Sequence, residues 1–179
     1  VQDAEAGLRL SLECLRELGH RRIGWYGYDE SDDRSRLLPR LAREYGMELP
    51  ETFSVCSEAI YELVDDPAFF DPLRRASRAE LPTALLCHND TIAVTLMRRL
   101  HECGLRIPDD LSLIGHDDIG LCGRLVPTLA SVGYGSREEL ARKLVDRVLN
   151  RLAHPELPRS VEVLPPQLIR RESIGAPRH

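Results

Sequence analysis

The chain has 179 residues, of which 42% are hydrophobic and 30% charged, and its formal net charge is −5. A chain of this length buries about two-thirds of the surface that it exposes when unfolded, so the composition predicts a folded globular protein and excludes a disordered one. Arginines are interspersed with carboxylates, so no face suits a row of phosphates, and we expect the chain alone to bind DNA poorly.

The chain has five cysteines, Cys14, Cys56, Cys87, Cys103 and Cys122. They are odd in number and form no CxxC pair, and several of them lie within apolar runs. This pattern favours a reducing, cytoplasmic setting in which cysteine acts as a small hydrophobe. No apolar run approaches the roughly 18 residues that span a bilayer, and the first residues lack the pattern of a secretion signal. We therefore expect no association with a membrane.

The first part of the chain predicts a helix, a strand and a second helix. Apolar residues recur at spacings of three and four before Gly19 (Ala4, Leu8, Leu12, Leu15 and Leu18). The apolar run Ile23 to Gly27 predicts a buried strand that ends in a polar loop. Residues 34–46 are typical of a helix, provided that Pro39 lies in its first turn.

The middle of the chain repeats this alternation. We expect a short strand at Phe53 to Cys56 and a helical stretch over 58–79 that prolines divide. The sequence ALLCH predicts a buried strand from Ala84, and a helix capped by Asn89 or Asp90 then ends at Gly104.

A further strand over Leu111 to Gly115 completes the pattern. Strands that alternate with helices predict an α/β fold with an open parallel sheet and helices on both faces. After Pro127 the pattern loosens, until Ser136 and Glu139 mark the start of a helix with one apolar stripe (Leu140, Leu144, Val148 and Leu152). The tail after His154-Pro155 holds two extended candidates, 161–164 and 167–171.

Polar triplets follow two of the predicted strands, His88-Asn89-Asp90 and His116-Asp117-Asp118. Open parallel sheets bind ligands at the carboxyl ends of their strands, where carboxylates and amides bond to hydroxyls or ring nitrogens. Arg34 and Arg36, just past the first strand, could supply a fork of donors.

Other interpretations remain open for these residues. Asn89 or Asp90 could simply cap a helix, and Asp117-Asp118 could form a turn. The His and carboxylate clusters could hold a metal ion, although the HExxH and CxxC spacings are absent. Cys87 and His88 do not predict a nucleophile and base, because adjacent strand residues point to opposite faces. No nucleophile elbow or phosphate loop occurs, so we expect no enzyme, no cofactor and no metal.

Three stretches together resemble the LacI/GalR family of bacterial transcriptional repressors. They are the string LGHRRI at Leu18 to Ile23, the run from Pro82 to Leu121 that carries CHND and GLRIPDDLSLIGHDD, and PPQLIRRES at Pro165 to Ser173. They occur in the family's order and cover nearly the whole chain.

The resemblance implies a periplasmic-binding-protein-like core of two α/β subdomains that holds a small, sugar-like effector in the cleft between them. It implies that 1–132 form the effector-binding C-terminal subdomain, that 133–155 form a crossover helix packing on an N-terminal subdomain, and that 156–179 return to the C-terminal subdomain. The helix-turn-helix that binds operator DNA and most of the first subdomain would then lie outside this sequence. A homodimer is implied for the whole repressor.

Residue by residue, the resemblance assigns effector contacts to Asn89, to Asp117 and to Arg36, and places Tyr134 close to the cleft. Arg36 is followed by Leu37-Leu38-Pro39 instead of the family's path to Gly, which leaves Arg34 as the alternative. The histidines before Asn89 and Asp117 replace a small and an aromatic residue, so the ligand could differ from a plain sugar, and a purine also suits the set. An extracytoplasmic solute-binding protein and a metal-dependent hydrolase are the competing functions.

Overall fold

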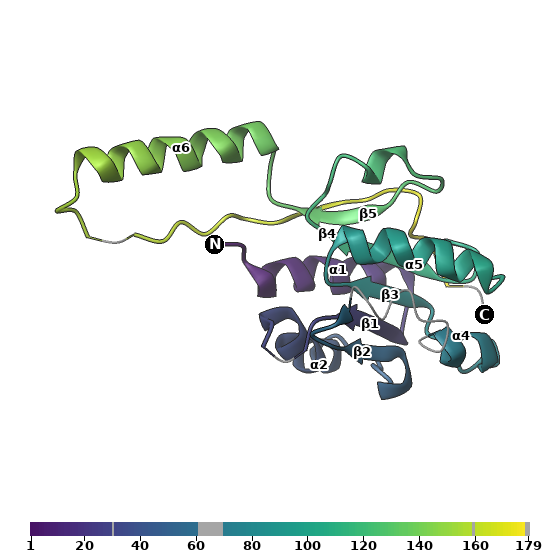
Figure 1. Cartoon of the computed structure of the whole chain (residues 1–179). Coiled ribbons are helices and arrows are strands. Elements are labelled where there is room, and N and C mark those ends of the chain that lie inside the picture. Colours follow the sequence, from purple (N-terminus) through teal and green to yellow (C-terminus); the bar gives the residue numbers. More distant parts are fainter. Residues whose placement is uncertain (30, 61–69, 159, 178–179) are drawn as a thin grey trace.

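The computed structural model describes residues 1–29, 31–60, 70–158 and 160–177. Within them a six-stranded sheet has the order β2-β1-β3-β4-β5-β6, and only β6 runs antiparallel to its neighbour (Figure 1). The strands are β1 (Ile23–Gly27), β2 (Ser54–Cys56), β3 (Ala84–Cys87), β4 (Ser112–His116), β5 (Ala130–Gly133) and β6 (Gln167–Ile169). The helices are α1 (Ala4–Leu18), α2 (Asp33–Glu44), α4 (Asp71–Arg75), α5 (Asp90–Glu102) and α6 (Arg137–Ala153), with 3-10 turns η1 (Glu51–Phe53) and η3 (Cys122–Arg124).

Two apolar layers cover the two faces of the sheet. Side chains alternate along each strand, so that Trp25 and Leu86 pack with α1 and α2, whereas Tyr26, Leu85 and Leu113 pack with α4 and α5. The α/β fold with helices on both faces is confirmed, and the antiparallel β6 is an addition at one edge. No helix among the described residues combines the length and the apolar character needed to cross a membrane.

The helix α1 follows its predicted signals closely. The side chain of Asp3 accepts a hydrogen bond from the backbone N–H of Ala6 at 2.9 Å, and Gly19 ends the helix with φ at 99°. Leu8, Leu12 and Leu15 are fully buried against the sheet. A left-handed residue after the last turn favours glycine, which explains why the helix stops there.

The helix α2 differs from its prediction at Pro39, which lies in the middle of the helix and not in its first turn. Asp32 caps the helix by accepting a hydrogen bond from the N–H of Arg34, so the helix begins earlier than the sequence pattern indicates. Pro39 is exposed, so the hydrogen bond that it cannot donate is lost on the solvent side, where water can bond to the carbonyl instead.

Other elements also differ from their predictions. The strand predicted over Leu111 to Gly115 is Ser112–His116, and the one predicted from Phe53 begins at Ser54 because Phe53 closes the turn η1. The strand β5 lies in the loosely patterned stretch where no element is predicted. Of the helical stretch predicted over 58–79, the structure shows α4, and 61–69 lie outside the described residues.

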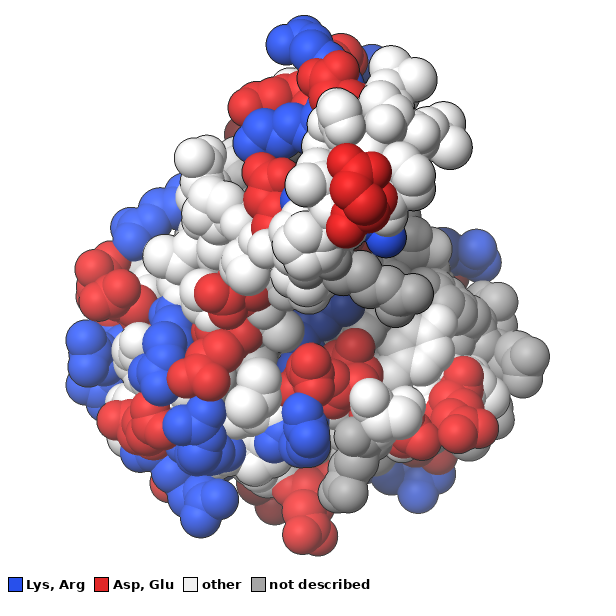
Figure 2. Space-filling model, turned by 90° about the vertical axis from the view of Figure 1, so that its left-hand side faces the viewer, with Lys and Arg blue, Asp and Glu red and all other residues white. Residues whose placement is uncertain are grey.

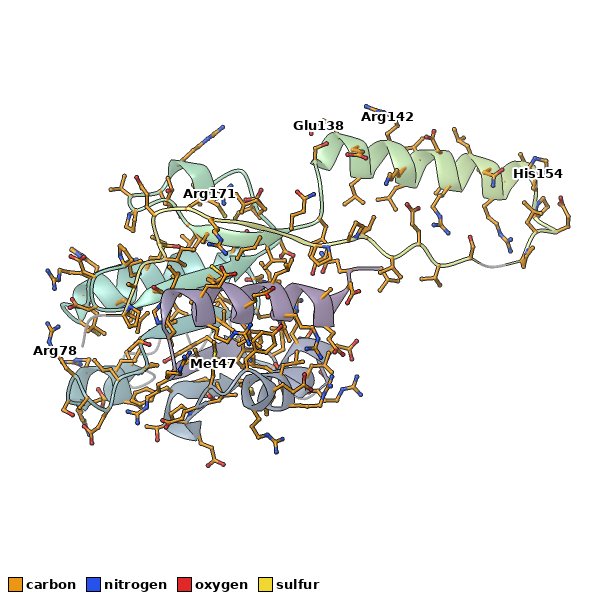
Figure 3. The ribbon with its side chains drawn as sticks, turned by 180° about the vertical axis from the view of Figure 1, so that it is seen from behind. Met47, Arg78, Glu138, Arg142, His154 and Arg171 are labelled. Atoms are coloured by element: carbon orange, nitrogen blue, oxygen red, sulfur yellow. The ribbon has the colours of Figure 1, made fainter. Side chains whose placement is uncertain are left out.

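The helix α6 and the tail form an arm that projects beyond the sheet (Figure 1). The guanidinium of Arg147 donates to Ser160 and to Glu162, which joins the helix to the tail running back beside it. In Figure 3 the arm extends from Glu138, near the sheet, to His154 at its far end, and Arg142 points away from the tail. Of the two extended stretches predicted in the tail, the first contributes one bridge, Leu164 with Gln2, and the second contains β6.

The arm carries a set of apolar side chains that are more than half exposed (Leu144, Val145, Val148, Leu149, Leu152, Val161 and Val163). Figure 2 shows charged side chains on one side of the arm and uncharged surface on the other. An apolar stripe of this kind is stabilised only when another surface covers it.

We therefore expect the 179-residue chain to self-associate through α6. Val148 lies in the apolar stripe, so Val148→Lys should shift the population toward monomer, because a buried ammonium would be desolvated. Asn150→Lys adds the same charge at an exposed polar position of the same helix and should leave association unchanged. Light scattering over a concentration series measures both, and a monomeric wild-type chain at high concentration would contradict the expectation.

Candidate functional site

The ends of three neighbouring strands bring histidine and tyrosine side chains to one edge of the sheet. Because β3, β4 and β5 run parallel, the chain leaves all three at the same side. His88 follows β3, His116 is the last residue of β4, and Tyr134 follows β5. His88 and His116 lie on the face covered by α1 and α2, since each is two residues beyond an inward residue of that face, Leu86 and Ile114.

The guanidinium of Arg34 binds the end of β3. Its Nη1 donates to the carbonyl oxygen of His88 at 2.7 Å, and its Nη2 donates to Nε2 of the same ring at 3.1 Å. Its Nε lies 3.6 Å from Oδ1 of Asp32, which is also 3.4 Å from Nδ1 of His88. The ring of Tyr28 packs edge-on against His88 with ring centroids 4.6 Å apart. Arg34, Asp32 and His88 thus form one polar cluster, in which the arginine side chain is 12% exposed.

His116 lies deeper, and its side chain is fully buried. Its Nδ1 donates to the carbonyl oxygen of Cys87 at 3.2 Å, because that oxygen can only accept. Burial lowers the pKa of His116 to about 3, and the nearby positive charge of Arg34 acts in the same direction. The imidazole is therefore neutral at physiological pH.

Three polar side-chain atoms of this edge are buried without a well-formed hydrogen bond: Nε2 of His116, the hydroxyl of Tyr134, and Nδ1 of His88, which still faces Oδ1 of Asp32 at 3.4 Å. Among the described residues these are the only buried side-chain nitrogen or oxygen atoms in that state. Burying a polar group without a partner costs about 1 to 3 kcal/mol, so their concentration at one edge of the sheet is typical of a binding site.

The loop after β4 holds the acidic pair in an unusual backbone conformation. Asp117 has φ at 97° and Asp118 has φ at 46°, both in the left-handed region that L-residues rarely adopt. Asp117 is exposed, and its Oδ1 accepts a long hydrogen bond of 3.5 Å from Gln2. Asp118 instead pairs with Arg171 at 2.6 Å, so the two carboxylates have separate surroundings.

A fully buried carboxylate, that of Asp90, holds this loop in place. Its Oδ2 accepts from the N–H of Ile119 at 2.8 Å, and its Oδ1 accepts from the hydroxyl of Ser131 at 2.6 Å. The same hydroxyl oxygen accepts from the N–H of Asp118 at 3.1 Å. At Gly115 an added Cβ would lie 2.2 Å from Oδ1 of Asp90, so only glycine allows the carboxylate to approach β4 this closely. Burial raises the pKa of Asp90, and the hydrogen bond from Ser131 opposes that rise.

The predicted ligand-binding residues take different positions around this edge. Tyr134 lies at the edge, and Asp117 lies in the exposed loop beside it. Asn89 caps α5, and its Oδ1 accepts from the N–H of Ile92 at 3.0 Å, as the capping interpretation predicts. Arg36 points to solvent and pairs with Asp33, its side chain 66% exposed, whereas the alternative arginine, Arg34, lies in the polar cluster.

The positions of the histidines, Asp90 and Cys87 bear on the metal site and on the thiol–histidine pair considered from the sequence. No group of three or more His, Cys, Asp or Glu side chains among the described residues could hold a metal ion. Asp90 is directed to Ser131 and Ile119, away from the two histidines that the metal interpretation adds to it. Cys87 is buried in the apolar layer on the opposite face from His88, which confirms its prediction as a core residue.

Asp90→Asn tests the role of the buried carboxylate. In the variant, the amide NH2 group of asparagine replaces one accepting oxygen and must face either the hydroxyl of Ser131 or the N–H of Ile119. One of the two present hydrogen bonds is then lost, so we expect the free energy of unfolding to fall by about 1 to 3 kcal/mol. Asp146→Asn, at an exposed position of α6, is the matched control and should leave it unchanged. Urea denaturation measures both, and equal midpoints for wild type and Asp90→Asn would refute this role.

The buried neutral histidine also predicts a pH dependence of stability. The pKa of His116 is lowered in the folded chain, so the unfolded chain binds a proton near pH 6.5 that the folded chain does not bind until about pH 3. Stability is therefore complete above pH 6.5 and falls as the pH decreases from there. His116→Gln should reduce this dependence between pH 6 and pH 5 by about one proton, or roughly 1 kcal/mol per pH unit, in urea titrations. Parallel curves for the two proteins would contradict this account.

Comparison with known proteins identifies the family. The model of the periplasmic binding protein-like domain matches residues 12–174. The HTH-type transcriptional repressor PurR of Vibrio atlanticus (strain LGP32) is 35% identical over 178 residues, which cover 97% of this chain and 52% of that protein. The Ribose operon repressor of Haemophilus influenzae (strain ATCC 51907 / DSM 11121 / KW20 / Rd) is 39% identical over 98 residues, which are 55% of this chain and 29% of that protein.

Among solved structures, a regulatory protein of the LacI family from Chloroflexus aggregans superposes with a TM-score of 0.81 at 30% identity. The match covers 97% of this chain and 62% of that one. The chain thus spans about half the length of the curated relatives that it matches end to end. The resemblance inferred from the three sequence stretches is confirmed, and the chain belongs to the periplasmic binding protein-like domain family, in the form found in LacI-family regulators.

Proposed function

We propose that this chain is the ligand-sensing part of a cytoplasmic bacterial repressor of the LacI/GalR type. In this proposal a small, sugar-like effector binds at the carboxyl edge of the sheet and changes how a helix-turn-helix elsewhere in the longer protein binds operator DNA. The names of the relatives, an HTH-type transcriptional repressor and a ribose operon repressor, support a regulator over an extracytoplasmic solute-binding protein.

The observation that carries the proposal is the group of unpartnered polar atoms at the ends of β3, β4 and β5. A ligand that supplies hydrogen bonds there would remove the cost of burying those atoms. The thiol of Cys87, next to His88 in the sequence, is buried with a raised pKa on the opposite face of the sheet, so it does not support a thiol nucleophile at this edge. Binding without catalysis is therefore the activity that we propose.

The arm suggests how the chain is divided in the longer protein. We assign 1–132 to the effector-binding subdomain, 133–155 to a crossover helix and 156–179 to a tail that returns to the first part. The exposed apolar stripe of α6 supports this division, since an N-terminal subdomain packed on the helix would cover it. A homodimer of the longer protein belongs to the same proposal.

In this proposal Asp117 accepts hydrogen bonds from effector hydroxyls, and Asn89 and Tyr134 contribute further contacts. Arg34 is better placed than Arg36 to supply the positive charge, since its guanidinium lies against His88 whereas Arg36 faces solvent. Arg34 and Arg36 are two residues apart on a helix, which separates their directions by about 200°. Both cannot face the same ligand.

Asp117→Ala in the longer protein tests the proposal. We expect effector affinity to fall about ten- to hundredfold, because the effector hydroxyls lose their acceptor. Operator affinity should stay unchanged and the melting temperature should fall only slightly, since the Asp117 side chain is exposed and makes one long hydrogen bond, while alanine is less favourable than aspartate at a φ of 97°. Effector titrations followed by calorimetry, together with melting curves and operator mobility shifts, measure all three.

Two matched arginine variants accompany this experiment. Arg34→Gln should weaken the effector response, and Arg36→Gln should not. Unchanged effector affinity in Asp117→Ala would remove that carboxylate from the site. A fall in melting temperature together with loss of operator binding would assign it a structural role instead.

A further inference from the structure

The contact between Arg34 and the ring of His88 depends on the protonation state of that ring. Nη2 of Arg34 lies 3.1 Å from Nε2 of His88, and because a guanidinium can only donate, Nε2 must carry a lone pair. The proton of the neutral ring then lies on Nδ1, which faces Oδ1 of Asp32 at 3.4 Å. The hydrogen bond from Arg34 to the ring therefore exists only while His88 is neutral.

A protonated His88 offers Arg34 no acceptor in either orientation of its ring. Both nitrogens of an imidazolium carry hydrogens, so Nε2 would direct an N–H at the N–H of the guanidinium, and a half-turn of the ring would not change this. Asp32 gains what Arg34 loses, because its carboxylate faces the Nδ1 hydrogen and the hydrogen bond becomes charge-assisted. Arg34 keeps only the bond from Nη1 to the carbonyl oxygen of His88.

The balance of charges in this cluster decides which of the two cations stays. The side chains of His88, Arg34 and Asp32 are 10%, 12% and 23% exposed, so water screens their charges only in part. While His88 is neutral, the guanidinium and the carboxylate balance. Protonation adds a second positive charge beside one carboxylate, and Tyr28, which packs edge-on against the ring, is uncharged and cannot offset it. The balance returns when Arg34 turns outward to the solvent.

The other groups around His88 act on the same equilibrium. Burial and the positive charge of Arg34 lower the pKa of His88, whereas the carboxylates of Asp32 and Asp117 raise it. His116, whose pKa burial lowers to about 3, is neutral and adds no charge at physiological pH. The ring of His88 is therefore neutral at physiological pH and becomes protonated on acidification, below its ordinary pKa of 6.5.

We propose that His88 is a pH-sensitive switch, which holds Arg34 in the polar cluster while its ring is neutral and releases it to the solvent when the ring is protonated. The consequence of the switch rests on the proposed function, because Arg34 is the arginine that we assign there to the effector. The effector response of the longer protein would then weaken on acidification, as in Arg34→Gln. The switch depends on a histidine at which this chain departs from the family's pattern.

Imidazole nitrogen NMR of the 179-residue chain, recorded from about pH 8 to about pH 5, measures the pKa of His88 without any ligand. Arg34→Gln removes the adjacent positive charge and should raise this pKa by about one unit, and Asp32→Asn should lower it by about as much. Asparagine is as good an N-cap as aspartate, so the second variant should keep α2. Asp33→Asn changes the exposed carboxylate that pairs with Arg36 and is the matched control, which should leave the pKa of His88 unchanged.

The side-chain Nε–H signal of Arg34 reports whether the guanidinium leaves the cluster. In His88→Gln the amide oxygen of glutamine can accept from Arg34 at every pH, so this variant retains the contact but cannot titrate. Hydrogen exchange of the Arg34 signal should be equal in the two proteins where His88 is neutral. Below the midpoint of the His88 titration, exchange should become faster in the wild type than in His88→Gln at the same pH.

Three results would overturn the inference. One is a ring of His88 that stays neutral down to about pH 5, since the switch would then not operate in the physiological range. Another is equal exchange of the Arg34 signal in wild type and His88→Gln while His88 titrates. The third is a pKa of His88 that Arg34→Gln and Asp32→Asn change no more than the control does. These measurements use no effector, so none of these results bears on the Asp117→Ala test of the proposed function.

Discussion

The buried carboxylate of Asp90 joins the three elements that form the proposed binding edge. It lies in the first turn of α5. It accepts hydrogen bonds from the hydroxyl of Ser131 on β5 and from the N–H of Ile119, which follows β4. Burying a carboxylate is costly, and these hydrogen bonds offset the cost only while the loop keeps its conformation. These hydrogen bonds hold the loop in which Asp117 and Asp118 adopt a left-handed backbone, while the side chain of Asp117 remains exposed.

Some polar side chains at this edge of the sheet have partners, and others do not. Arg34 pairs with His88 and Asp32, and Asp118 pairs with Arg171. Nε2 of His116 and the hydroxyl of Tyr134 remain buried without a partner, whereas Nδ1 of His88 faces Oδ1 of Asp32 at 3.4 Å.

The fold could be predicted from the sequence where a periodic pattern coincides with a cap, as in α1 and α5. The strand β5 could not, because its residues, ASVG, are small for a reason that only the tertiary structure shows. Ser131 must reach Asp90, and a Cβ at Gly133 would lie 2.8 Å from Cβ of Asp118. A run of small residues, which here lets neighbouring segments approach the strand closely, is typical of a loop when only the sequence is considered. The choice between Arg34 and Arg36 depended likewise on where α2 begins, since each shift of one residue turns a helix by about 100°.

The arm and the binding edge are connected through very few residues. Tyr134 precedes Gly135, whose φ of 95° turns the chain, and the next residue, Ser136, caps α6 by accepting from the N–H of Glu139 at 3.1 Å. In the tail that returns from the arm, Leu164 forms a β-bridge with Gln2, and the side-chain amide of Gln2 donates to Asp117. Both connections of the arm to the body therefore pass beside a residue of the proposed site. If the effector binds Tyr134 and Asp117 as proposed, it contacts residues that adjoin Gly135 and Gln2, at the base of the arm.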